Sequence, residues 1–329
     1  MRGWRSGARY GRVAVRHALM ICSIWAAVGC GGGTNAGAAG GSGGARKRVG
    51  VSLLTKEQEF YRQLEGGLRV EAAAKGIDLL VTSGDFDLAK QQAEIDNFIV
   101  QHVDAIVVCP VDSKGIGPAI KRAEDAGIPV FTADIRAYGV TVTTHVTSDS
   151  REGGRQAAEF MARASGDHGV VGIIGQAETQ TGYDRAHAFG EALSRHPGFR
   201  LVGELNGGGV RDRALKAAED MLQAHPDLTG IFAINDEMAL GALAAARARG
   251  RTPADFTIVG FDATPEAVTA IKGHTLLKAD VVQHPDNIGS GTIDAIVAHF
   301  AKQPVDSLIM IPVTVFDSST SLQGGKAAS

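Results

Sequence analysis

Carboxylate, amide and aromatic side chains stand just beyond the apolar segments of this chain of 329 residues. Such groups bind a small ligand by stacking on an apolar face and by exchanging hydrogen bonds with its edge. The residues in these positions are Gln58, Phe60, Tyr61, Cys109, Asp134, Asn235, Asp236, Phe261 and Asp262. The sequence contains no HExxH or CxxC motif and no histidine cluster at metal-ligand spacing. We therefore expect a binding protein rather than an enzyme, with no metal and no cofactor.

Short apolar segments alternate with segments of helical periodicity, and this alternation positions those residues. Strands that are apolar on both faces and alternate with helices indicate parallel sheets covered on both sides. The alternation runs twice, so we predict an α/β fold of two Rossmann-like, doubly wound lobes. Ligands of such sheets bind beyond the carboxyl ends of the strands, and two facing lobes would bring these ends to one cleft. The predicted strands are 49–54, 77–81, 105–108, 129–132, 170–174, 201–202, 231–234 and 256–259, and the better-defined helices are 116–126, 155–164, 185–193 and 238–246.

The N-terminal segment has the pattern of a targeting signal. Arginines at 2, 5, 9, 12 and 16 precede the apolar run Ala18–Val28, which at about 11 residues is too short to span a bilayer. The run ends in Ala27-Val28-Gly29-Cys30, which resembles the lipobox of bacterial lipoproteins. We expect a signal peptide over 1–29, lipidation of Cys30 and a flexible glycine-rich tether over 30–47. The alternative is ordinary signal-peptidase cleavage and a product without an anchor.

Composition excludes several other classes of protein. Hydrophobic residues make up 44% and charged residues 21% of the chain, as in globular proteins. The formal net charge is −3 although the leader is arginine-rich, so the body is acidic and unsuited to nucleic acid. Of the three cysteines only Cys109 lies beyond the leader and lipobox, so no intrachain disulfide is expected.

Three motifs in the second half of the chain carry a resemblance to a known family. They are the segment IFAINDEMALGA at 231–242, the segment VGFD at 259–262 and the segment QHPDNIG at 283–289. In these motifs the chain resembles the ribose-binding-protein group of the type 1 periplasmic binding proteins, and the resemblance extends over about 48–316. It implies a three-segment hinge with crossings near Ser148/Asp149, near Gln283/His284 and near Pro312. The implied N-terminal lobe is 48–148 plus 284–312, the C-terminal lobe is 149–283 plus 313–323, and 324–329 is a tail.

The resemblance also implies a function. It predicts an extracytoplasmic, monomeric solute-binding protein of an ABC importer, which closes on a small sugar or polyol and presents it to a membrane permease. A periplasmic sensor of the same fold, signalling to a histidine kinase or chemoreceptor, is the alternative. A regulator of the lac-repressor type would need a helix-turn-helix ahead of Arg48, where this chain has a glycine tether.

The resemblance assigns roles to individual residues, each with a structural alternative. Phe60 and Tyr61 match aromatic residues that stack on a sugar ring, or else belong to the core. Asp134 and Asp262 match carboxylates that accept from sugar hydroxyls, although Asp262 could instead cap a helix near Pro265. The strand-end amide Asn235 could likewise only orient the following helix. The remaining matches are Arg185 and the hinge residue Gln283.

Three departures from the family pattern predict a ligand other than ribose. The family has Asn where Cys109 stands, which we expect to be a small buried hydrophobe, and Arg where Tyr183 stands. The family also has an aromatic residue in the second lobe, at the position where this chain has Gly209 or Val210. Tyr183 could restore an aromatic wall, and Arg136 could supply a guanidinium.

Overall fold

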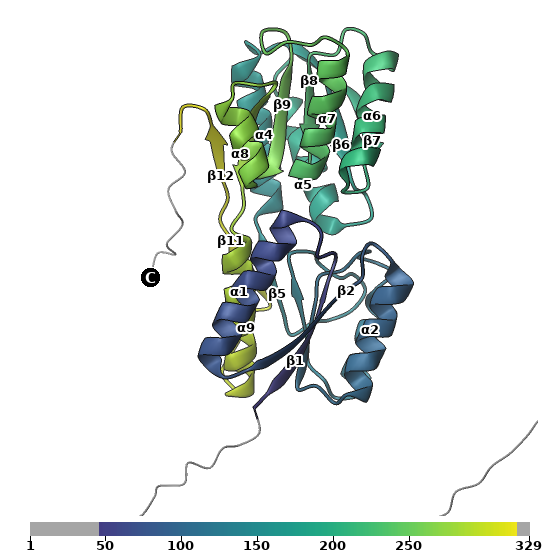
Figure 1. The fold of residues 1–329 in the computed structure, drawn as a ribbon, viewed down its shortest axis with the longest axis vertical. Helices are drawn as coiled ribbons and strands as arrows, with labels where there is room; N and C mark the ends of the chain where they lie inside the picture. The colour runs from purple at the N-terminus through teal and green to yellow at the C-terminus, as the bar shows by residue number, and fades with distance from the viewer. Residues whose placement is uncertain (1–45, 321–329) are drawn as a thin grey trace, which may run out of the picture. The chain divides into compact units, whose positions relative to one another are not determined.

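The computed structural model describes residues 46–320, and the predicted signal peptide, Cys30 and most of the predicted tether lie outside this range. The described residues form two α/β lobes, each built on a sheet of six strands (Figure 1). No helix in 46–320 is both long enough and apolar enough to cross a membrane.

The sheet of the first lobe is parallel throughout, in the order β11-β5-β4-β3-β1-β2. Its helices cover both faces: α1 and α9 lie side by side on one, with α2 on the other (Figure 1). The strands are β1 (Arg48–Leu53), β2 (Asp78–Ser83), β3 (Ala105–Val108), β4 (Val130–Ala133), β5 (Thr144–Ser148) and β11 (Leu308–Ile311). The helices are α1 (Glu59–Lys75), α2 (Leu88–Val100), α3 (Gly117–Asp125) and α9 (Pro285–Phe300).

The second lobe repeats this arrangement in the order β12-β10-β9-β8-β6-β7, with only β12 antiparallel to its neighbour. Within it α4 packs on α5 and α6 packs on α7. The strands are β6 (Gly169–Gly175), β7 (Phe199–Asn206), β8 (Gly230–Ala233), β9 (Thr257–Asp262), β10 (Leu277–Val282) and β12 (Thr314–Asp317). The helices are α4 (Ser150–Ala164), α5 (Gln180–Leu193), α6 (Arg211–Ala224), α7 (Asp236–Ala248) and α8 (Pro265–Lys272).

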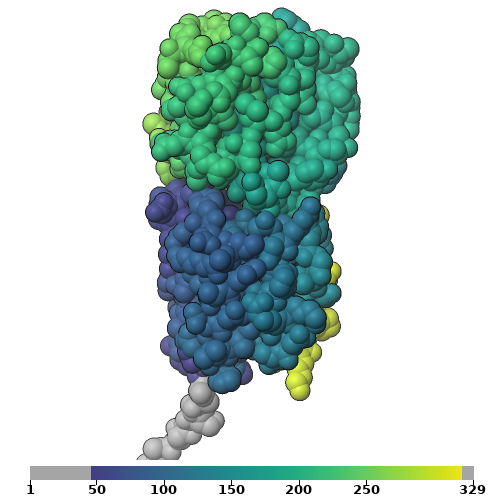
Figure 2. Space-filling view, turned by 90° about the vertical axis from the view of Figure 1, so that its right-hand side faces the viewer, coloured from purple at the N-terminus to yellow at the C-terminus, as the bar shows by residue number. Residues whose placement is uncertain are grey.

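The chain passes between the lobes three times. It leaves the first sheet after β5, returns between β10 and α9, and leaves again between β11 and β12. The three connections follow β5, β10 and β11 at the carboxyl ends of these strands. The carboxyl ends of the parallel strands in both lobes therefore point toward a common seam, along which the lobes meet in Figure 2.

Two helices begin about one turn earlier than their apolar periodicity predicts. Helix α4 begins at Ser150 because the Asp149 side chain accepts a hydrogen bond from the backbone N–H of Glu152. Helix α5 begins at Gln180 because Thr179 caps it through the N–H of Gly182. Caps of this kind satisfy first-turn N–H groups that no helical carbonyl reaches, so they extend a helix into polar sequence.

Candidate ligand-binding site

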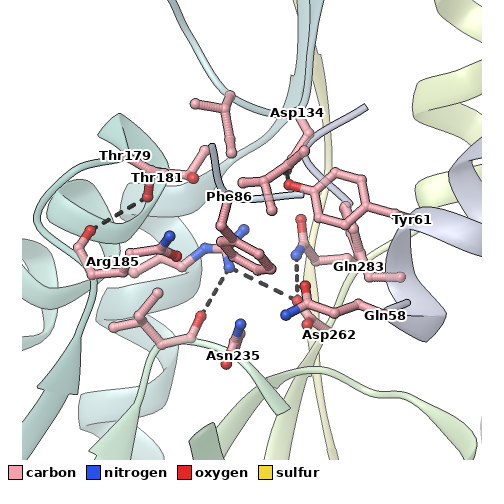
Figure 3. A pocket seen from close by; sticks show the side chains of 15 residues that line it. Gln58, Tyr61, Phe86, Asp134, Thr179, Thr181, Arg185, Asn235, Asp262 and Gln283 are labelled. Atoms are coloured by element: carbon pink, nitrogen blue, oxygen red, sulfur yellow. Dashed lines mark hydrogen bonds and ion pairs between the residues drawn. The ribbon is translucent and has the colours of Figure 1, made fainter. Parts of the chain in front are cut away.

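A cavity of about 30 Å³ lies where the strand ends of the two lobes meet. Residues from both lobes line it (Figure 3). They are Leu54, Gln58, Phe60, Tyr61, Phe86, Asp134, Ile135, Gln176, Thr179, Thr181, Arg185, Ile234, Asn235, Asp262 and Gln283.

Two carboxylates reach the cavity through unusual backbone conformations. Asp134 follows β4 with φ +63°, and Asp262 ends β9 with φ +124°. Residues other than glycine adopt positive φ at a free-energy cost, and such conformations concentrate at functional sites. From these two turns both residues line the cavity.

The wall from the first lobe combines aromatic rings with a buried acid. Phe60 and Tyr61 are 6% and 4% exposed and meet edge to face, with ring centroids 5.1 Å apart. Both line the cavity, although they are adjacent in the sequence. The Tyr61 hydroxyl donates to Oδ2 of Asp134 at 2.8 Å. Burial raises the pKa of Asp134, while the Arg185 charge and the Tyr61 hydrogen bond oppose this shift. Oδ1 of Asp134 has no partner within the described residues.

Arg185 is the cation of the second-lobe wall, and three groups hold it in place. Its Nη1 donates to the carbonyl of Ile234 at 2.8 Å and lies 3.8 Å from Oδ1 of Asp262. Its guanidinium carbon is 3.8 Å from the ring centroid of Phe261, which is a favourable cation–π distance. Phe261 is fully buried and does not line the cavity, so its part is to support Arg185.

Two amides, one from each lobe, converge on Gly209. Nε2 of Gln58 in the first lobe donates to the Gly209 carbonyl at 2.7 Å, and Nδ2 of Asn235 donates to the same oxygen at 3.1 Å. Asn235 also caps α7, because its Oδ1 accepts from the N–H of Met238 at 2.9 Å. Asn235 therefore both orients α7 and lines the cavity. Gly209 has φ +76°, a conformation that favours glycine.

Gln283, in the hinge segment after β10, contacts Asp262 directly. Its Nε2 donates to Oδ1 of Asp262 at 2.6 Å, and its Oε1 has no partner among the described residues. Asp262 does not cap α8, since Thr264 occupies that position and its Oγ1 accepts from the N–H of Ala267. The Asp262 carboxylate is thus free of any capping role and faces the cavity (Figure 3).

Five residues named from the sequence lie outside this cavity. Asp236 begins α7 behind it, and Phe261 supports Arg185 from the core. Cys109 is fully buried in the first-lobe core, where burial raises the pKa of its thiol. Tyr183 is 51% exposed and stacks on His187 in an outer groove. Arg136 is exposed and lies in a separate groove beside His145. The aromatic wall and the guanidinium of the cavity come from other residues.

Several cavity residues were not predicted from the sequence, although the rule that predicted the others applies to them. Phe86 lies in the loop after β2, at an edge strand, and Gln176 and Thr179 follow directly after β6. No candidate was predicted after either of these two strands. Thr181 belongs to the first turn of α5, which begins earlier than predicted.

A family model described as the periplasmic binding protein domain matches residues 49–304. This chain belongs to that family. The match spans both lobes, and it accords with a binding protein that acts outside the cytoplasm and carries out no catalysis.

Several relatives of this periplasmic binding protein have names that state a small polyhydroxylated ligand. The ribose import binding protein of Salmonella typhimurium is 32% identical over 274 residues, covering 81% of this chain and 91% of the relative. That of Bacillus subtilis is 34% identical over 251 residues, covering 75% and 79%. A solved Caulobacter myo-inositol binding protein superposes with a TM-score of 0.79 at 27% identity, covering 84% of this chain and 94% of its own.

Behind the cavity, the binding protein buries two further carboxylates against each other. Asp236 begins α7 and Asp280 lies on β10, and they are 1% and 0% exposed. Asp236 accepts from the N–H of Thr264 at 2.6 Å and Asp280 from that of Ala263 at 3.2 Å. One oxygen of each carboxylate faces Gly260 and has no partner in 46–320. Burial and the charge of Asp236 raise the pKa of Asp280 well above its usual range. The pair is therefore most stable when it shares a proton.

We expect Asp280→Asn to stabilise the binding protein increasingly as the pH rises. A raised carboxyl pKa in the folded state means that the contribution of Asp280 to stability is fully present below its unfolded pKa of about 4 and is lost as the pH rises through the folded pKa. Asparagine mimics the protonated acid, since its Oδ1 can accept from Ala263 and its amide can donate to Asp236. Urea unfolding at pH 5 and pH 8 should show a gain of about 1–2 kcal/mol that is larger at pH 8.

The control for this prediction is Asp306→Asn, which removes an exposed carboxylate just before β11. Its effect on the free energy of unfolding should stay within about 0.5 kcal/mol at both pH values. If Asp280→Asn and the wild type had equal free energies of unfolding at pH 5 and at pH 8, a proton shared by Asp236 and Asp280 would be contradicted.

Proposed function

We propose that this protein is the solute-binding component of an ABC importer and binds a small sugar or polyol between its lobes. The observation that carries the proposal is the cavity between the lobes, in which two carboxylates and several amides surround a site walled by Phe60 and Phe86. Aromatic faces match the C–H face of a sugar, and carboxylates accept from adjacent hydroxyls. The names of relatives support this ligand class: they include ribose import binding proteins, a xylitol-binding protein and a myo-inositol binding protein.

Hinge closure is the proposed mechanism. Contacts between the lobes support it: Nε2 of Gln58 donates to Gly209, and the N–H of Ser113 donates to the carbonyl of Glu178 at 3.0 Å. Oγ of Ser113 also accepts from the N–H of Gln180 at 2.9 Å. A ligand that contacts both walls stabilises the closed arrangement, because an open form offers it only one wall. The permease would then recognise the closed surface.

For the lobe boundaries we propose 48–148 plus 284–312 for the first lobe and 149–283 plus 313–323 for the second. Strand membership supports this division, since β5 and β11 pair in one sheet and β10 and β12 pair in the other. A hinge at these three crossings includes Gln283, whose bond to Asp262 connects the ligand site to the moving segment.

We further propose that the mature protein is a monomer attached to a membrane by a lipid on Cys30, a residue outside the described range. Cys30→Ser should shift the protein from the membrane fraction to the soluble fraction, because a thioether-linked lipid needs the cysteine sulfur. Cell fractionation followed by immunoblotting measures this shift. The control is Cys109→Ser, which replaces the buried cysteine of the first lobe and keeps Cys30. If the wild type and Cys30→Ser appeared in the soluble fraction in equal amounts, the proposed lipid anchor would be contradicted.

The sensor alternative has weaker support than import. A fructose-binding periplasmic domain of a hybrid two-component system has the same fold with a TM-score of 0.77, but at 23% identity this likeness concerns the fold alone. The relatives above 30% identity include import binding proteins from several bacteria.

A thermal-shift screen of the purified protein against pentoses, hexoses, inositols, alditols and their amino derivatives tests the proposal. A ligand with a micromolar Kd, present at 100 times that concentration, should stabilise the protein by about 2.7 kcal/mol, or several degrees in Tm. The absence of any shift across this panel would refute a sugar or polyol ligand.

A further inference from the structure

The ionisable groups that line the cavity do not balance in charge. They are Asp134, Asp262 and the single cation Arg185, together with the Tyr61 phenol. All four lie within buried walls, where water cannot screen a surplus charge. With both acids ionised and Tyr61 neutral, the lining carries one negative charge in excess.

Further acids lie behind Asp262, and they increase this excess. The groups that face its carboxylate are Arg185, Gln283 and the charges of Asp134 and Asp236, with Asp280 beyond Asp236. Arg185 is the only cation among them. It is also engaged by the Ile234 carbonyl and the Phe261 ring. A single guanidinium cannot neutralise Asp134 and Asp262 together, so an empty site must hold a proton or attract a cation.

We propose that the preferred ligand is a polyol or sugar bearing a primary ammonium group, which supplies the missing positive charge. This inference rests on the proposed function and specifies the ligand class of the same site. Asp134 lines the cavity and is 4% exposed, and its Oδ1 has no hydrogen-bond partner in the described part of the chain. Oε1 of Gln283 is a second unpartnered acceptor in the same walls. An ammonium group has three donors and no acceptor, which matches such a set.

The uncharged remainder of the cavity suits the polyol part of that ligand. Phe60 and Phe86 offer apolar faces, and Gln58, Thr181 and Asn235 offer neutral polar groups. A metal ion is not the required cation, because no group of His, Cys, Asp and Glu side chains in 46–320 is arranged to hold one. The charge therefore belongs with a ligand that also fills the space between the rings.

Matched ligand pairs test the proposal by calorimetry on the purified protein. The pairs are D-glucosamine with D-glucose, D-galactosamine with D-galactose, 1-amino-1-deoxyribitol with ribitol, and 1-amino-1-deoxyglucitol with glucitol. In the pair that fits the cavity, the amine should bind at least tenfold more tightly than its hydroxyl counterpart, since hydrogen bonds between charged groups are about twice as strong as neutral ones. Titration in buffers of different ionisation enthalpy should show proton release with the amine and none with the neutral partner.

Two variants locate the effect. Asp262→Asn removes one charge and keeps the acceptor for Gln283, so it should reduce the preference for the amine at least tenfold. Thr181→Val removes a neutral hydroxyl from the same cavity and should change both members of a pair alike. Polyols that bind without any amine preference, in every pair, overturn this inference and leave the proposed function standing. Failure of all eight compounds and of the wider sugar screen overturns both.

Discussion

Asp262→Ala is expected to abolish ligand-induced thermal stabilisation by the strongest ligand of the screen. The variant removes a carboxylate that the cavity holds at the end of β9, next to Arg185 and Gln283. Each hydrogen bond from a ligand to an ionised group contributes about 1.5–3 kcal/mol. Loss of two such bonds weakens binding by at least about 100-fold, which removes most or all of the Tm shift at a ligand concentration about 100 times the wild-type Kd.

The unliganded Asp262→Ala protein should remain folded, so that the loss reports binding alone. Burial and the neighbouring Asp236 charge raise the pKa of Asp262 well above its usual range, so ionisation of this carboxyl does not stabilise the fold. The relief of this charge offsets the loss of the contacts with Gln283 and Arg185, and the Tm without ligand should stay within a few degrees of the wild-type value. Asp306→Ala, at an exposed position, serves as the control that retains the full ligand shift. An unchanged ligand shift in Asp262→Ala would exclude this cavity as the binding site.

Gly67→Ala is expected to lower stability by about 2–3 kcal/mol, or about 5–10 °C in Tm. Gly67 lies in α1, and a Cβ atom there would overlap the backbone carbonyl of Asp286 in the first turn of α9. The contact is reciprocal, because a Cβ on Gly289 would overlap the carbonyl of Leu64. The two helix backbones thus touch beside the hinge segment, and a methyl group must push them apart.

The neighbouring glycine provides the matched control. A Cβ on Gly66 meets nothing within 4 Å, and the position is exposed in the same helix. Gly66→Ala should stabilise the protein by about 0.5–1 kcal/mol, since alanine is the better helix former. Thermal unfolding of the two variants side by side measures the difference. Similar Tm values for Gly66→Ala and Gly67→Ala would show that α1 and α9 do not depend on this close approach.

Local sequence predicts the wholly apolar strands better than the strands of mixed composition. Segments such as 105–108 and 231–234 are wholly apolar because helices cover both faces of the strand. Strands β5 and β10 have mixed composition, with His145 in one and Lys278 and Asp280 in the other, and no strand was predicted there. Burial of these polar side chains is possible only through partners that tertiary contacts provide, such as Thr132 for His145.

The sequence by itself determined the two α/β lobes and the strand-end carboxylates Asp134 and Asp262, because alternation and strand ends are local patterns. Tertiary structure decided which strand-end residues share one cavity. Phe86 comes from an edge strand to complete the aromatic wall, while Tyr183 and Arg136 lie in outer grooves. It also decided the charge of the site. Arg185 and the acids of four separate segments meet only when both sheets are formed and the lobes face each other, and no local pattern encodes that sum.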